Sequence, residues 1–177
     1  TEKTAGGFYA LTWCPATNYF LLGETAQVGK LKKHLPIVFG TDSTLTASWN
    51  IWDQLREART TALLSDDELQ HAVTKTAASV WGLEKKGHIA AGMRADLVIA
   101  DTGNFFSTDP ANLLLVIQQG KLRLIDAGLE QLLQEAGPEQ YSACDIRGVK
   151  KFVWGDIAGL VKEIQHYCPG IELPVTV

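Results

Sequence analysis

Cysteine and methionine are scarce in this sequence, and their scarcity narrows the possible classes of protein. The 177 residues include three cysteines, Cys14, Cys144 and Cys168, and one methionine, Met93. No two cysteines stand in C-x-x-C spacing, which argues against a zinc ribbon or a dithiol redox motif. We therefore interpret them as reduced thiols of a cytoplasmic protein. Because no methionine precedes Met93, we expect the chain to begin inside a longer polypeptide.

The sequence also lacks an excess of basic residues and a long hydrophobic run. It has 16 Lys and Arg against 20 Asp and Glu, a net charge of -4, so nucleic acid is not an expected partner. The most apolar segment, ANLLLVIQQG, is far shorter than the roughly 20 residues of a membrane helix, so we expect no membrane contact. With 46% hydrophobic residues, the chain has the composition of a globular protein.

Two short apolar segments near the start predict strands. GGFYALTWCP is typical of a strand that Pro15 ends, because proline cannot donate a hydrogen bond to a neighbouring strand. ATNYFLLGETAQVGKLKKHL then combines a loop with a short helical patch, and LPIVFG predicts the second strand. Two strands joined through a helix form a βαβ unit, so we expect them to be parallel.

Helices and then short strands are predicted further along the chain. STLTASWNIWDQLREARTTALL has apolar residues at helical spacing. A second helix opens at the capping box formed by Ser65 and Glu68, and Gly82 is placed to end it. Gly-punctuated short strands follow, including a pair around Gln119-Gly120, which predicts a small antiparallel β module.

The tail of the chain has a mixed pattern. LEQLLQEAGP predicts a short helix, KKFVW a strand, and the following segment a helix capped by Asp156. Its role is left open between packing under the larger domain and contacts between copies of the chain. The sequence as a whole predicts an α/β protein.

A carboxylate directly follows the second predicted strand, in LPIVFGTDS. Asp42 stands after Gly40 and Thr41 at the tip of a hydrophobic segment, where a charge is costly unless something pairs with it. An Asp in such a place is often a turn former or a helix N-cap. A ligand or proton-transfer role is the alternative.

Three segments together resemble a known family. TWCPATNYFLLG, LPIVFGTDS and TKTAASVWGLEKKGHIAAGMRADLVIAD follow one another as in the carboxy-terminal part of amidohydrolase-superfamily metal hydrolases, over residues 8–126. The branch they resemble is that of cytosine deaminase, guanine deaminase and triazine hydrolase. The resemblance implies a (β/α)8 barrel with a small β-sandwich. Residues 1–82 would supply barrel strands seven and eight and the final helices, 83–126 part of the sandwich, and 127–177 an α+β extension.

The resemblance also implies a reaction. Such enzymes hydrolyse non-peptide C–N bonds of small molecules, by deaminating a heterocycle or opening a cyclic amide. A divalent metal there produces hydroxide from bound water near neutral pH, and an acid carries the proton to the leaving nitrogen. Asp42 matches the family's last metal ligand and proton shuttle. Zinc is the expected metal, with iron or manganese as alternatives.

The remaining ligands of that family are missing from the chain. No two histidines stand in the H-x-H spacing that the family requires, and Asp42 alone cannot make a metal site, so the chain by itself is expected to be inactive. The alternative is a non-catalytic remnant, or an independently folding fragment whose exposed strand edges pair with another copy in a homo-oligomer. The histidines, expected at the surface or in packing roles, are His34, His71, His88 and His166.

Three further residues are candidates for contact with substrate. Asn18 lies near the substrate pocket in the resembling deaminases, with an Asx turn as the alternative. Cys14 is expected near the strand end, as a pocket residue or, since no base is nominated, a buried structural thiol. Trp13, with Trp49 and Trp52, could wall a pocket for a flat heterocycle or belong to the core.

Overall fold

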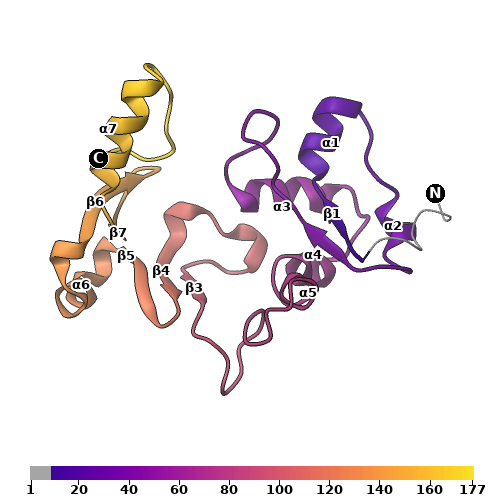
Figure 1. Cartoon of the computed structure of the whole chain (residues 1–177), viewed down its shortest axis with the longest axis horizontal. Helices are drawn as coiled ribbons and strands as arrows, with labels where there is room; N and C mark the ends of the chain where they lie inside the picture. The colour runs from indigo at the N-terminus through magenta and orange to yellow at the C-terminus, as the bar shows by residue number, and fades with distance from the viewer. Residues whose placement is uncertain (1–8) are drawn as a thin grey trace. The chain divides into compact units, whose positions relative to one another are not determined.

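The computed structural model describes residues 9–177, and the chain divides into two compact units, 1–93 and 94–177 (Figure 1). The first unit combines a two-stranded sheet with helices α1 to α5, and the second contains a five-stranded sheet with α6 and α7. This is a mixed α/β chain, as predicted. Among residues 9–177, no helix is long and apolar enough to cross a membrane.

The first unit is built on a parallel strand pair. Strand β1 (Leu11–Trp13) pairs with β2 (Ile37–Phe39), and helices α1 (Pro15–Leu22) and α2 (Val28–Leu31) lie between them in the chain. The predicted βαβ unit is confirmed. Helix α1 was expected to be partly loop, but Pro15 stands at its first position, where a missing N–H group leaves no hydrogen bond unmade.

Three helices follow β2 in the first unit. Helix α3 (Ile51–Thr60) begins later than predicted, because the side chain of Asn50 accepts a hydrogen bond from Trp52 N and caps the helix there. The predicted capping box of Ser65 and Glu68 is confirmed at the start of α4 (Asp66–Ala72).

The prediction of a single helix from Ser65 to Gly82 is wrong, because α4 ends at Ala72 and α5 (Lys75–Val80) is a separate helix. At the break, the Thr74 hydroxyl donates to the Gln70 carbonyl oxygen at 2.7 Å, a local bond that competes with helix continuation. Gly82, with φ of 64°, does lie just past α5.

The second unit is an antiparallel sheet with the strand order β3-β4-β5-β7-β6. Gln119-Gly120 joins β4 to β5 and Arg147-Gly148 joins β6 to β7, each with positive φ at both residues, as a tight two-residue hairpin turn requires. The hairpin predicted around Gln119-Gly120 is confirmed. The strands are β3 (Leu97–Ala100), β4 (Leu113–Gln118), β5 (Lys121–Asp126), β6 (Tyr141–Ile146) and β7 (Val149–Trp154).

Two predictions for this part of the chain were wrong. Residues 84–96 form turns and no strand, because Gly87 and Gly92 adopt φ of 89° and 82° and interrupt an extended backbone. The tail contributes two strands instead of one, and both join the sheet of β3, β4 and β5. The predicted boundaries at residues 82 and 126 stay a prediction.

Helices and short 3₁₀ turns complete the second unit. Helix α6 (Glu130–Ala136) precedes β6, and α7 (Ile157–Tyr167) follows β7, capped by Asp156 as predicted. The 3₁₀ turns are η2 (Phe105–Ser107), η3 (Pro110–Asn112), η4 (Ala127–Leu129) and η5 (Pro138–Gln140).

A buried lysine ties the strands of the second unit together. Lys151 on β7 is 0% exposed, and its ammonium donates to the carbonyl oxygens of Ala111 and Leu113 at 2.7 and 2.8 Å and to the Asp126 carboxylate at 2.5 Å. All three ammonium hydrogens are therefore used. The hydrogen bond from Lys151 also lowers the pKa of the Asp126 carboxyl, so both charges are stabilised by their pairing.

Candidate functional site

The parallel pairing brings the carboxyl ends of β1 and β2 to one edge of the small sheet. Cys14 follows β1, and Gly40 follows β2, where its N–H donates to the Trp13 carbonyl oxygen at 2.9 Å. A Cβ atom at Gly40 would lie only 2.6 Å from the Cys14 sulfur and 2.7 Å from Thr12 Cγ2. This close approach requires a residue without a side chain, which explains the glycine before Thr41 and Asp42.

Asp42 lies at this edge with an exposed side chain. Its φ is 53°, a left-handed conformation that Asp adopts more readily than most residues. Burial raises the pKa of the Cys14 thiol, and the negative charge of Asp42 raises it further, so the two groups are electrostatically coupled. Within residues 9–177, no hydrogen bond or ion pair reaches the Asp42 carboxylate. Asp42 lies in the irregular loop just before the turn of residues 44–46, while the N-cap of α3 is Asn50.

Trp13 and Asn18 are linked through a residue that the sequence did not nominate. Trp13 is 1% exposed, and its indole N–H donates to the Thr25 hydroxyl oxygen at 2.7 Å. That hydroxyl donates in turn to Asn18 Oδ1 at 2.9 Å. Asn18 lies inside α1 and is not in an Asx turn. Thr25 stands in the polar loop after α1, where nothing in the sequence distinguishes it.

The other two tryptophans near the site lie around the start of α3. Trp49 is exposed, and Trp52 is half-buried. The Trp52 indole nitrogen has no hydrogen-bond partner in the part of the chain that the structure describes. Trp13 thus belongs to the core, whereas Trp49 is exposed.

The loop that carries Asp42 is held from two sides. The hydroxyls of Thr46 in the loop and Thr17 on α1 lie 2.7 Å apart. Gln54 on α3, which the sequence analysis did not single out, donates to backbone carbonyl oxygens in the loop. Its polar side chain in a predicted apolar helix face is the one signal that could have drawn attention to it.

The described residues do not form a metal centre by themselves. Among residues 9–177, no group of three or more His, Cys, Asp or Glu side chains is placed to hold a metal ion. Asp42 can therefore contribute one ligand but not a site. The exposed side chains include all four histidines, His34, His71, His88 and His166.

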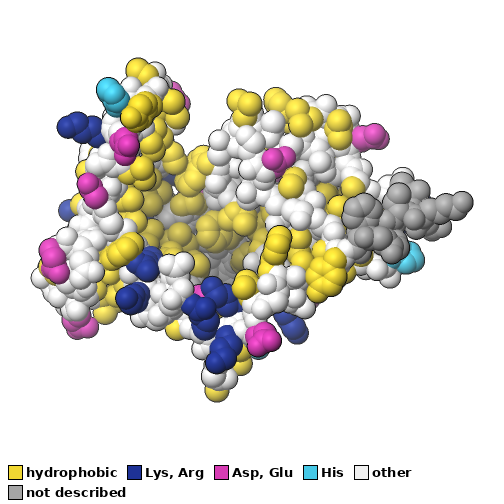
Figure 2. Space-filling model, in the orientation of Figure 1, with side chains coloured by type: hydrophobic (Ala, Val, Ile, Leu, Met, Phe, Trp, Pro, Cys, Tyr) yellow, Lys and Arg dark blue, Asp and Glu magenta, His cyan; other side chains and the backbone are white. Residues whose placement is uncertain are grey.

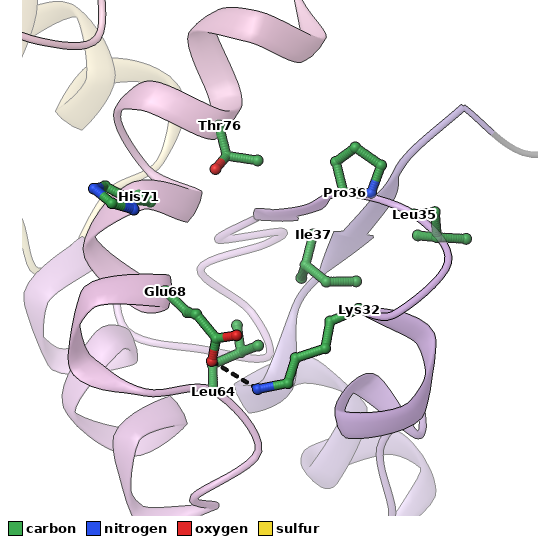
Figure 3. Close-up of a pocket in the computed structure, with 8 residues that line it drawn as sticks. All are labelled: Lys32, Leu35, Pro36, Ile37, Leu64, Glu68, His71 and Thr76. Carbon is green, nitrogen blue, oxygen red and sulfur yellow. Dashed lines mark hydrogen bonds and ion pairs between the residues drawn. The ribbon is translucent and has the colours of Figure 1, made fainter.

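A cavity of about 170 Å³ lies at the opposite end of β2 (Figure 3). The Lys32 ammonium reaches across it to the Glu68 carboxylate at 2.7 Å, and this hydrogen bond lowers the pKa of Glu68. Pro36 and Ile37 at the start of β2 line the cavity, whereas Asp42 follows the other end of the strand. The cavity is therefore distinct from the candidate site. Its lining comprises Lys32, Leu35, Pro36, Ile37, Leu64, Glu68, His71 and Thr76.

Comparison with known proteins identifies the family. No curated protein and no solved structure matches this chain. The family model described as "Amidohydrolase family" matches residues 18–123, more than half of the 177 residues. The match includes Asn18, β2 with Asp42, and the first strands of the second unit. The chain therefore belongs to the amidohydrolase family.

Proposed function

We propose that the chain is the carboxy-terminal part of a metal-dependent hydrolase that acts on non-peptide C–N bonds of a small-molecule substrate. In this proposal β1 and β2 are strands seven and eight of a (β/α)8 barrel, and the second unit holds part of a β-sandwich. The branch is that of cytosine deaminase, guanine deaminase and triazine hydrolase. Membership of the amidohydrolase family supports the hydrolase class.

One observation carries the proposal. The Asp42 carboxylate stands directly after β2 on an exposed loop, and no hydrogen bond or ion pair from residues 9–177 occupies it. Active sites of parallel barrels lie at the carboxyl ends of the strands. A carboxylate there can take the proton of an attacking water and pass it to the leaving nitrogen. We place Cys14, at the same sheet edge, and Asn18, on the adjoining helix, on the substrate side. Trp13 lies behind them in the core and is linked to Asn18 through Thr25.

The divalent metal in this proposal is zinc, with iron or manganese as alternatives. Asp42 is the one ligand that we assign to it from this chain. Because the described residues do not complete a metal site, the other ligands would have to come from outside residues 9–177. The 177-residue chain alone should then be inactive.

The deciding experiment compares this chain with the protein expressed from its complete gene. Metal content is measured by mass spectrometry, and ammonia release is followed with amino-substituted heterocycles and cyclic amides. We expect near-stoichiometric metal and turnover in the complete protein, with neither in the 177-residue chain. Metal and turnover missing from both would contradict the proposal.

A second candidate, a non-catalytic chain that self-associates, is favoured by exposed apolar surface on the first unit (Figure 2). Phe20, Leu21 and Leu22 at the end of α1 are 67%, 62% and 70% exposed, and contiguous apolar surface of this kind marks interaction sites. Light scattering should then give the mass of a homo-oligomer, and Leu21→Glu should return the mass of one chain. A wild-type mass of one chain would exclude this candidate.

The state of the cysteines is relevant to the cellular compartment of the protein. Cys14, Cys144 and Cys168 are free thiols, and burial raises the pKa of Cys14 and Cys144, which lowers their fraction of reactive thiolate. We propose that the protein is cytoplasmic, where such thiols stay reduced.

A further inference from the structure

The loop between β2 and α3 is hydrogen-bonded to a buried side-chain amide. Gln54, in the first half of α3, is 1% exposed. Its Nε2 donates to the carbonyl oxygen of Thr41 at 3.2 Å and to that of Ser48 at 2.5 Å. Both partners are acceptors only, so the NH₂ group of the amide must face them. One side chain thus joins the beginning of the loop to its end.

We infer that Gln54 is a positioning residue that fixes where the Asp42 carboxylate lies. Thr41, whose carbonyl it holds, immediately precedes Asp42. The Asp42 backbone is in the left-handed region, with φ of 53°, and such conformations persist where the surrounding structure holds them. This inference rests on the proposed function of Asp42.

Among the described contacts that tie the loop to other elements, the hydrogen bond from Gln54 is the one that reaches a residue adjacent to Asp42. The Thr17 and Thr46 hydroxyls join the middle of the loop to α1, and the Ser48 hydroxyl donates to the Asp53 carboxylate at 2.9 Å. These contacts act four or more residues after Asp42. The hydrogen bonds nearer to Asp42 are internal to the loop, where the Ser43 carbonyl oxygen accepts from the N–H groups of Thr46 and Ala47 at 3.1 and 3.0 Å. Since no described residue bonds the Asp42 carboxylate itself, its place depends on the backbone that Gln54 holds.

The side chain of Gln54 also carries a cost that packing alone does not explain. Its Oε1 atom is buried without a hydrogen-bond partner among the described residues, and an unsatisfied buried acceptor is unfavourable. A methionine of similar length would fill the space without that cost. The two hydrogen bonds to the loop are the contribution that methionine could not make.

The test is hydrogen exchange of backbone amides in the 177-residue chain without metal. Gln54→Met removes both donors and keeps the length of the side chain. We expect exchange in residues 41–48 to accelerate about tenfold or more, because two hydrogen bonds are lost. Exchange in α4 and in the second unit should stay unchanged. Gln70→Met, at an exposed position of α4, is the matched control and should leave the loop as it is.

Two hydrogen-exchange results would overturn the inference. Unchanged exchange in residues 41–48 of the Gln54→Met chain would show that the amide does not hold the loop. Equal acceleration throughout the first unit would show that Gln54 supports folding alone.

In the complete protein, Gln54→Met should lower kcat about tenfold and leave KM nearly unchanged, because Asp42 acts on the proton and not on substrate binding. A raised KM with unchanged kcat would also contradict a positioning role.

The exchange result and the proposed function can fail separately. Loop exchange requires neither metal nor substrate, so it tests Gln54 even if Asp42 has no catalytic role. Asp42→Asn should leave loop exchange unchanged, since the carboxylate makes no hydrogen bond within residues 9–177. The effect of Asp42→Asn on turnover tests the proposed function and does not test the role of Gln54.

Discussion

The two units differ in how completely their polar groups are satisfied. In the first, buried Asn50 Nδ2, Trp52 Nε1 and Gln54 Oε1 lack hydrogen-bond partners among the described residues, all within five residues of one another around the start of α3, whereas Arg123 Nε on β5 is the one such atom described in the second unit. In the second, Lys151 is fully buried and uses every hydrogen of its ammonium. Unmade hydrogen bonds are expected to gather at functional sites. The contrast supports a candidate site in the first unit and a structural role for the second.

The sheets of the two units also differ, in the length of their strands and in how the strands are connected. Strands β1 and β2 have three residues each and need a long connection to become parallel, whereas most strands of the second unit have six and are joined by tight turns. At one edge of the second sheet, Asp145 on β6 exchanges backbone hydrogen bonds with Thr176 at 2.7 and 3.0 Å. We expect the second unit to be the more stable one, because its sheet is larger and its buried polar groups are more fully paired.

The largest effect should come from Asp42→Asn in the complete protein. Loss of a proton-transferring carboxylate should lower kcat by about 10²- to 10⁴-fold. Asn tolerates the left-handed conformation at least as well as Asp, so the melting temperature of the metal-free 177-residue chain should hardly change. Because Asp42 is also the metal ligand that we assign, the metal content of the complete variant is measured beside its turnover. Wild-type turnover in this variant would remove Asp42 from the mechanism.

Lys151→Met should have the largest effect on stability, confined to the second unit. It leaves Asp126 and two carbonyl oxygens without their donor, which should cost about 2–4 kcal/mol of unfolding free energy. Denaturant unfolding followed at Trp154 measures the loss. Lys150→Met, at the exposed neighbouring position, is the control and should stay within about 0.5 kcal/mol of wild type.

The Lys151–Asp126 pair also predicts a pH dependence. The pKa of Asp126 is lowered in the folded protein, first by the hydrogen bond from Lys151. Its stabilising contribution is therefore present above the unfolded pKa of about 4 and is lost as the pH falls through the lower folded value. Unfolding between pH 6 and pH 3 should be less pH-dependent in Lys151→Met than in wild type. Identical profiles would contradict the pairing.

Gly40→Ala tests the close approach at the strand ends. The added Cβ would meet the Cys14 sulfur at 2.6 Å and Thr12 Cγ2 at 2.7 Å, so the first unit should lose about 1–3 kcal/mol through overpacking. Thermal unfolding followed at Trp13 measures this. Combining the change with Cys14→Ala should recover part of the loss, and purely additive effects of the two changes would count against the contact.

The smallest effect should come from the helix cap of α4. Ser65→Ala removes the side-chain acceptor for Glu68 N and should cost about 1 kcal/mol. Ser79→Ala, at an exposed position of α5, is the control that removes a serine hydroxyl without removing a cap. Equal melting temperatures of the two variants would show that the cap contributes nothing measurable.

Local features were predictable because they depend on neighbours in the chain. The capping box at Ser65, the turn at Gln119-Gly120 and the cap at Asp156 each need only a few consecutive residues. Where local signals compete, prediction was less successful. Pro15 suggested the end of a strand but also begins α1, and Thr74 interrupts a segment with a continuous helical pattern.

The sequence by itself determined the helix caps, the tight turns, the parallel βαβ order and the motifs that resemble the amidohydrolase family. Only the tertiary structure decided that Thr25 links Trp13 to Asn18, that Lys151 serves three acceptors and that Gln54 holds the loop of Asp42. These contacts join residues 6 to 40 positions apart. Their geometry arises when separate elements pack together, and no short segment encodes it.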